Sequence, residues 1–320
     1  MTSQTRTPGD SPLLDVHHHM IPPEFLEALD CAGLDTSGFP TWSHGQSLRI
    51  MDRTGIGKAL LSLPSPGVWL GDDGKARSLA RSCNQYAASL VDRFPKRCGA
   101  LAALPFPDLE GAFEETTHAL DTLELDGVIL YTNVRGHYVG DPEFEPLMAE
   151  LSRRKALVLL HPNPSPREAE TAPLYPWAEY PIDVARAWAR MILNDTLVAH
   201  SHIRWILGDS GGVVPFVAER LGKAHYAKDG GLRWGRILKD LLLKRHGGLE
   251  LAKAVGYDTV GADNPVTHTA LRRLVGLERI HFGSDFPWGS EENVEASVRF
   301  FELDVRPASS NAGLHGGTGI

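Results

Sequence analysis

Eight short apolar runs recur along this chain, and each is followed by a polar loop and a stretch with helical periodicity. The runs are Leu13–His17, Lys58–Leu63, Gly99–Leu104, Gly127–Tyr131, Ala156–His161, Ile203–Gly208, Ala254–Thr259 and Arg279–Ser284. Most are continuously apolar, which is typical of parallel strands covered on both faces. The amphipathic segments between them include Ala76–Arg93, Leu109–Leu123, Glu143–Arg154, Ile182–Leu193 and Pro265–Val275. The alternation predicts an α/β protein with the (β/α)8 TIM barrel fold, and the chain length suits it.

The same alternation predicts a single barrel domain over residues 13–304. Residues 1–12 are polar and predict a disordered leader, and the Gly- and Ser-rich residues 305–320 predict a flexible polar tail. A last helix is predicted at Glu292–Phe301, and it is expected to cover the eighth strand.

Two loop insertions interrupt the repeat, at residues 31–47 and 163–181. The second is rich in proline and contains Tyr175, Trp177 and Tyr180. Because the loops after the strands form the active-site face of a barrel, these insertions are candidate substrate walls. The alternative for any one of their residues is an ordinary surface loop.

Composition narrows the class of partner. The chain has 320 residues, 42% of them hydrophobic, and a net charge of −8. No basic stripe exists to bind nucleic acid or an anionic membrane surface, so a small molecule is the expected partner. Cys31, Cys83 and Cys98 are odd in number and lack CxxC spacing, which predicts reduced thiols in a cytoplasmic protein.

His17 and His19 stand two residues apart at the end of the first predicted strand. Residues at i and i+2 of a strand point to the same face, so both imidazoles can reach one metal ion. The alternative is a solvated or structural histidine cluster.

Other strand ends decide between these interpretations. The fifth strand ends in His161 and the eighth is followed by Asp285, at the same mouth of the barrel as His17 and His19. Three histidines and one aspartate predict a site for a single divalent ion with an open position for water or substrate.

Several motifs carry a resemblance to a known family. They are Asp15-x-His17-x-His19, Met51-Asp52-x-x-Gly55-Ile56, Asp126-Gly127-Val128, Asp141-Pro142-x-Phe144-x-Pro146-Leu147, His161-Pro162, Gly211-Gly212-x-x-Pro215-Phe216, Tyr257-Asp258-Thr259 and Phe282-Gly283-Ser284-Asp285-Phe286-Pro287. Together they resemble the aminocarboxymuconate-semialdehyde decarboxylase-like branch of the amidohydrolase superfamily. Within that branch, the sequence most resembles methylsalicylate decarboxylase-like proteins.

The resemblance implies a metal-dependent, non-oxidative decarboxylase of a small aromatic, salicylate-like carboxylic acid. It makes His17, His19, His161 and Asp285 the metal ligands. Zinc is expected from the three nitrogen donors, and manganese is the alternative. The resemblance also implies a homodimer.

The chain departs from this family where a catalytic histidine usually ends the sixth strand. Alignment on Gly211, Gly212 and Pro215 places Asp209 there. Decarboxylation needs a proton donor to the ring carbon, and an ordinary carboxyl group is ionised at neutral pH. Three alternatives therefore stay open. Asp209 is an acid/base with a shifted pKa, or it is an additional metal ligand or a base that orients water, or the site has lost the family reaction. We predict Asp209 and Asp285 as the catalytic residues.

Substrate contacts are expected from residues that follow strands or match the family. Arg49 corresponds to an arginine that relatives use to hold a substrate carboxylate, with a surface salt bridge as the alternative. Aromatic walls suit a flat substrate, although each residue could equally be packing. The predicted set is Arg49, Trp69, Tyr131, Asn133, Trp177 and Trp288.

Two other functions stay open. A metal-dependent hydrolase of a lactone, ester or amide would use Asp209 as a base toward water. A binding protein would have kept the metal pocket and lost turnover.

Overall fold

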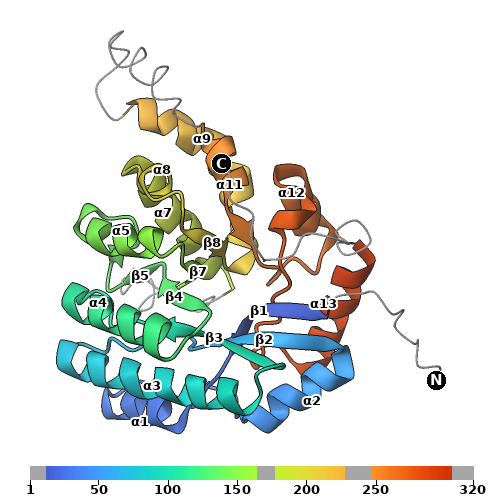
Figure 1. Ribbon diagram of the computed structural model, residues 1–320. Coiled ribbons are helices and arrows are strands. Elements are labelled where there is room, and N and C mark those ends of the chain that lie inside the picture. The colour runs from blue at the N-terminus through green and yellow to red at the C-terminus, as the bar shows by residue number, and fades with distance from the viewer. Residues whose placement is uncertain (1–11, 164–176, 228–246, 305–320) are drawn as a thin grey trace.

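The computed structural model describes residues 12–163, 177–227 and 247–304 of the chain. Within these ranges seven parallel strands form one curled sheet in the order β1-β2-β3-β4-β7-β8-β9. Helices lie around the outside of this sheet (Figure 1). The strands are β1 (Leu13–His19), β2 (Ile56–Ser62), β3 (Cys98–Ala103), β4 (Gly127–Tyr131), β7 (Leu157–His161), β8 (Arg204–Leu207) and β9 (Gly256–Tyr257).

An extended segment, residues 280–286, lies between the two edge strands of this sheet. On one side, the backbone N–H of His281 donates to the carbonyl of Tyr257 in β9 at 2.8 Å. On the other side, the backbone N–H of Val16 in β1 donates to the carbonyl of Phe282 at 2.9 Å. Both edges are thus tied to one segment, which fits the predicted barrel.

The predicted strand at Arg279–Ser284 is wrong as a strand, because this segment makes only isolated bridges to its neighbours. Its first residue ends a short 3-10 helix, η4 (Leu277–Arg279). Just beyond it, Asp285 has a left-handed backbone conformation with φ of 53°, which interrupts a regular ladder. The same local backbone places the Asp285 side chain at the mouth of the sheet.

All five predicted amphipathic segments are helical. The segment at 109–123 divides into α4 and a π-helical turn, η1 (His118–Thr122). A small hairpin of β5 (Asn133–Val134) and β6 (His137–Tyr138), absent from the predicted pattern, follows β4. The α-helices are α1 (Pro23–Cys31), α2 (His44–Thr54), α3 (Asp73–Arg93), α4 (Leu109–Thr117), α5 (Glu145–Arg153), α7 (Glu179–Leu193), α8 (Thr196–Ala199), α9 (Val214–Ala227), α11 (Gly248–Ala254), α12 (Pro265–Leu274) and α13 (Glu291–Asp304), with the 3-10 turns η2 (Pro142–Phe144) and η3 (Asp209–Gly211).

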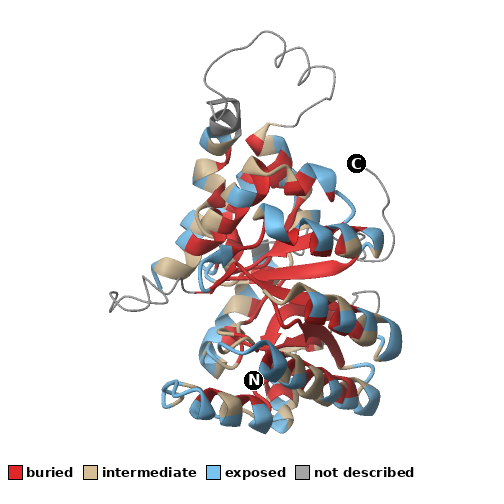
Figure 2. Cartoon of the chain, turned by 90° about the vertical axis from the view of Figure 1, so that its left-hand side faces the viewer, coloured by how far each residue is buried: buried red, intermediate tan, exposed pale blue. Residues whose placement is uncertain are grey.

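The core lies between the strands and the inner faces of the helices. Figure 2 shows buried residues along the strands and exposed residues on the outer helix faces. In β7, Val158, Leu159 and Leu160 are fully buried, so neither face of this strand meets water. Each such side chain contributes about 1.5–3 kcal/mol relative to an exposed one. The strand ends therefore form a rigid frame for polar side chains.

Three predictions fall largely outside the described residues: the leader, apart from residue 12, the tail at 305–320 and residues 164–176 of the second insertion. The first insertion, 31–47, contains the start of α2. In the described part of the chain, no helix combines the length and apolar character needed to cross a membrane.

Candidate metal centre and active-site cavity

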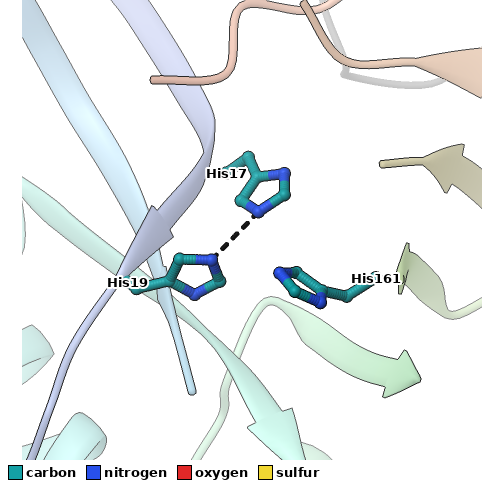
Figure 3. Close-up of side chains that lie close together, drawn as sticks. All are labelled: His17, His19 and His161. Atoms are coloured by element: carbon teal, nitrogen blue, oxygen red, sulfur yellow. Dashed lines mark hydrogen bonds between the residues drawn. The ribbon is translucent and has the colours of Figure 1, made fainter. Parts of the chain in front are cut away.

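Three histidine side chains converge at the carboxyl ends of β1 and β7 (Figure 3). His17 and His19 come from β1 and His161 ends β7, and one nitrogen of each lies within 4.8 Å of the others. The Nε2 atoms of His17 and His19 are 3.0 Å apart. All three side chains are buried. Period-2 geometry and matching strand ends thus bring together the three histidines predicted as ligands.

The outer nitrogen of each ring has a hydrogen-bond partner. His17 Nδ1 donates to the Asp258 carboxylate at 2.5 Å, and His161 Nδ1 donates to the carbonyl of Pro162 at 2.6 Å. His19 Nδ1 lies 3.4 Å from the carbonyl of Ser62. The acceptors of His17 and His161 carry no proton, so the Nδ1 of each ring carries one, whereas His19 Nδ1 also lies 3.3 Å from the Ser62 hydroxyl, which can donate or accept; the Nε2 atoms face inward.

This arrangement fits a bound divalent cation. The Nε2 atoms of His17 and His19, 3.0 Å apart, need either a proton or a metal cation between them. Histidine ligands of metals typically donate their other ring N–H to a carboxylate or carbonyl, as His17 and His161 do here. Metal–nitrogen bonds of about 2.0–2.1 Å suit ligand atoms at this separation.

Burial keeps two of the rings neutral, the form that binds a metal. Burial, together with the neighbouring His17, holds the pKa of His19 and of His161 well below the usual range. His17 differs: burial lowers its pKa, but the charge and hydrogen bond of Asp258, with smaller contributions from other carboxylates, raise it to about 9. The cluster can therefore carry one positive charge on His17.

Asp285 lies beside this cluster on the cavity side. Its Oδ1 is 3.3 Å from His19 Nε2 and 3.7 Å from His17 Nε2. Burial raises the pKa of its carboxyl group, whereas His17 opposes the shift. The predicted fourth ligand is thus within reach of an ion bound by the histidines.

A cavity of about 480 Å³ opens in front of the histidines. This volume suits a small molecule. Aromatic and apolar side chains make much of its wall. Its lining residues are His19, Phe39, Pro64, Ser65, His161, Trp177, Tyr180, Pro181, Asp209, Gly212, Val213, Phe216, Val260, Gly261, Thr267, Asp285 and Trp288.

Asp209 lines the same cavity but lies outside the three-histidine cluster. It begins η3 with a left-handed φ of 50°. Burial and the nearby charge of Asp258 raise the pKa of Asp209 to about 8, although His17 opposes the shift. The carboxyl group is therefore largely protonated at neutral pH and can donate a proton.

Asp258 connects these parts. One of its oxygens accepts from His17, and the other accepts from the backbone N–H groups of Ser210, at 2.9 Å, and Val260, at 3.2 Å. The carboxylate is fully buried. It therefore fixes both the His17 ring and the backbone turn that carries Asp209.

Two of the predicted substrate residues line the cavity. Trp288 is 40% exposed, and its ring centroid lies 5.4 Å from that of His19 and 5.5 Å from that of Phe39. Trp177 is 80% exposed at the rim. Both present apolar surface to a ligand in the cavity.

The other predicted substrate residues lie elsewhere. Arg49 is exposed on α2, whose buried face carries Ser47, Ile50 and Met51, and it is not among the cavity-lining residues, so its predicted contact with substrate stays a prediction. Arg49 was predicted from its position in a family motif, and helical periodicity turns its side chain to the outside of α2.

Three further predicted residues serve internal contacts. Trp69 donates to Asp73 at 2.6 Å. The Tyr131 ring lies 5.8 Å from that of His161, but its hydroxyl donates to the carbonyl of Leu63 at 3.0 Å. Asn133 is buried in a hydrogen-bond network. None of the three is among the cavity-lining residues.

Several lining residues escaped the sequence prediction. Ser65 follows β2, Thr267 opens α12, and Phe216, 64% exposed, begins α9. Their common signal is a position shortly after a strand, which many surface residues share.

Known proteins resemble this chain over most of its length. The profile of the amidohydrolase family matches residues 14–308. The decarboxylase yanB of Aspergillus niger is 34% identical over 307 residues, which cover 90% of this chain and 81% of that protein. The 6-methylsalicylic acid decarboxylase acuB of Aspergillus aculeatus is 35% identical over 301 residues, covering 91% and 89%. A solved structure described as an amidohydrolase II superposes with a TM-score of 0.78 at 26% identity, covering 89% of this chain and 90% of that one.

Proposed function

We propose that this chain, which belongs to the amidohydrolase family, is a metal-dependent, non-oxidative decarboxylase of a small aromatic, salicylate-like carboxylic acid. The similar proteins yanB and acuB are named as decarboxylases, and acuB as acting on 6-methylsalicylic acid. The observation that carries the proposal is that two of the three converging histidines, His19 and His161, line the same cavity as Asp209, whose pKa is raised by burial.

His17, His19 and His161 would hold the ion through their Nε2 atoms, and Asp285 would complete the set. A bound divalent cation supplies positive charge that attracts and orients an anionic substrate. We keep zinc as the expected ion from the three nitrogen donors, with manganese as the alternative.

Asp209 is proposed as the proton donor. Its carboxyl proton passes to the ring carbon that bears the carboxylate, which breaks the aromaticity of the ring. The bond to the carboxylate carbon then breaks, carbon dioxide leaves, and the electron pair of that bond restores the ring. Asp209 regains its proton from water, so one proton and one aromatic carboxylate yield one arene and one carbon dioxide.

Asp285 lines the same cavity as Asp209 and is proposed to assist as the second catalytic carboxylate. The flat walls contributed by Trp177 and Trp288 are proposed to pack against the ring of the substrate. We also keep a homodimer and a cytoplasmic location as proposals.

Product analysis tests the proposal. The protein is loaded with zinc or manganese and incubated with 6-methylsalicylate and other hydroxybenzoates, and carbon dioxide is measured against loss of the acid. We expect a one-to-one ratio, and His161→Ala is expected to remove the activity. Hydrolysis of esters or lactones without release of carbon dioxide would instead support the hydrolase. Tight binding of the acids without turnover would support a binding protein.

Asp209→His adds a test of the donor. If Asp209 is the acid, this variant keeps a titratable donor but shifts the pH profile toward that of histidine, whereas Asp209→Asn loses turnover. If the native protein is inactive and Asp209→His gains decarboxylation, the native Asp209 is what keeps this site from carrying out the decarboxylation.

A further inference from the structure

The hydroxyl of Ser65 has a fixed direction. Ser65 lies after β2 on the wall of the cavity, and its Oγ is 2.5 Å from Oδ1 of Asn163. Asn163 follows the predicted ligand His161 by two residues. The contact therefore lies beside the metal centre, on the cavity wall.

The orientation of the Asn163 amide decides which partner donates. Its Nδ2 lies 2.9 Å from the backbone carbonyl of Asn133, which can only accept. The NH2 group must therefore face that carbonyl, and Oδ1 must face Ser65. Two acceptors cannot share this contact, so the Ser65 hydroxyl donates its only proton to Asn163.

The network behind Asn163 holds this orientation. The Asn133 Nδ2 donates to the backbone carbonyl of Asn163 at 2.7 Å and to Asp183 at 2.9 Å, while its Oδ1 accepts from the N–H of Gly136 at 3.1 Å. Asn133, Asn163 and Asp183 are all buried. Reversing the Asn163 amide would leave a buried carbonyl without a donor, which is costly.

Ser65 consequently offers only lone pairs to the cavity. Thr267, another lining residue, differs from Ser65, because its Oγ1 accepts from Nδ2 of Asn264 at 3.1 Å. The Asn264 amide is fixed by the backbone N–H groups of Val266 and Thr267, which donate to its Oδ1. The Thr267 hydroxyl thus keeps its proton.

We propose that Ser65 is a specificity-determining residue that selects ring substituents able to donate a hydrogen bond, such as a phenolic hydroxyl. The inference rests on the proposed function, because it assumes an aromatic acid in this cavity. A substituent with a proton satisfies the Ser65 lone pair, whereas one without a proton displaces water from Ser65 and leaves it unpaired. Asn163 and the buried network behind it are positioning residues for this selection.

Binding of matched benzoates tests the inference. The probes are 3- and 4-hydroxybenzoate, the corresponding aminobenzoates, which also donate, and the corresponding fluorobenzoates, which do not. A substituent at ring position 3 or 4 is too far from the carboxylate for both groups to bind the same metal ion, so these probes report on contacts of the substituent with the protein. Dissociation constants are measured on the metal-loaded protein by calorimetry. At one ring position at least, we expect the hydroxy and amino compounds to bind about tenfold more tightly than the fluoro compound.

Two variants assign the preference to its residue. Ser65→Ala is expected to remove the hydroxy-over-fluoro preference, mainly by strengthening the binding of fluorobenzoates, because no lone pair is then left unpaired. Thr267→Val removes another cavity hydroxyl, one that keeps its proton, and is expected to keep that preference. Equal binding of all probes to the parent protein, or an unchanged preference in Ser65→Ala, would overturn the inference alone. Failure of all these probes to bind, together with failure of 6-methylsalicylate, would overturn the proposed function as well.

Discussion

Asp258→Asn is expected to weaken metal binding without touching a metal ligand. The asparagine keeps an oxygen for the backbone N–H groups of Ser210 and Val260, which now bond to Asp258 Oδ1. Its NH2 group then faces His17 Nδ1, where a carboxylate oxygen lies at 2.5 Å in the native protein. A donor in that place favours the His17 tautomer with the proton on Nε2, which cannot bind a metal.

The contacts set the size of this effect. Both Asp258 and His17 are fully buried, so no water can replace the lost acceptor. Loss of a carboxylate that supports a metal-bound histidine typically lowers metal affinity 10- to 100-fold, or about 1.4–2.7 kcal/mol. Complete burial and the inverted hydrogen bond favour the upper end of this range.

The assay is competition with a chromophoric chelator, which measures the metal dissociation constant directly. Asp15→Asn is the matched control, because Asp15 is a buried carboxylate that contacts His18 Nδ1 at 3.0 Å through one oxygen. Its other oxygen accepts from two backbone N–H groups, as in Asp258. Both variants should lose stability, but only Asp258→Asn should lose metal affinity. A dissociation constant within twofold of the native value in Asp258→Asn, or equal losses in both variants, would refute the reasoning.

Four further predictions concern Asp209 and the ion. Asp209→Asn should lower kcat at least 100-fold, the typical contribution of a general acid, and leave the metal content unchanged; loss of metal would make Asp209 a ligand instead. Native kcat/KM should be level below about pH 8 and fall about tenfold per pH unit above it, because the pKa of Asp209 is raised to about 8; a profile unchanged in Asp209→Asn would contradict this. The raised pKa of Asp209 lies above the value of about 4 expected in the unfolded chain, so the native protein loses stability as the pH rises from about 4 to about 8, whereas Asp209→Asn does not. The Tm of Asp209→Asn relative to that of the native protein should therefore be higher at pH 8 than at pH 5. Chelation should remove activity and, from a metal concentration of 100 Kd, lower the free energy of unfolding by about 2.7 kcal/mol in denaturant titrations, with both recovered on adding metal back.

The strands of the sheet were predictable because burial on both faces leaves continuous apolar runs. All seven sheet strands match predicted runs to within two residues at each end, although β9 covers only two residues of its predicted run. The segment at 280–286 has the same composition but a different backbone, since the left-handed φ of Asp285 depends on contacts with β1 that composition does not encode. Hydrophobic pattern therefore located this segment without giving its local structure.

The histidine cluster was predictable for a similar reason, because strand period and strand ends fix where His17, His19 and His161 point. Helix faces and loops are less constrained. Arg49 matched a family position, yet the packing of α2 turns it outward. Ser65 gave no signal, because its character as an acceptor arises only from the amide orientation of Asn163, far away in the sequence.

The absence of Lys and Arg among the lining residues that the structure describes has a consequence for Asp209. A substrate carboxylate entering this cavity finds no cationic side chain there, so within the described wall its charge must be balanced at the histidine cluster. Asp209 and Asp285 line that same space, and a third negative charge near them disfavours ionisation of Asp209. Substrate binding should thus raise the pKa of Asp209 further and keep its proton in place for the ring carbon. Because kcat reports groups in the substrate complex and kcat/KM those in the free enzyme, the alkaline limb of kcat should lie at higher pH than that of kcat/KM.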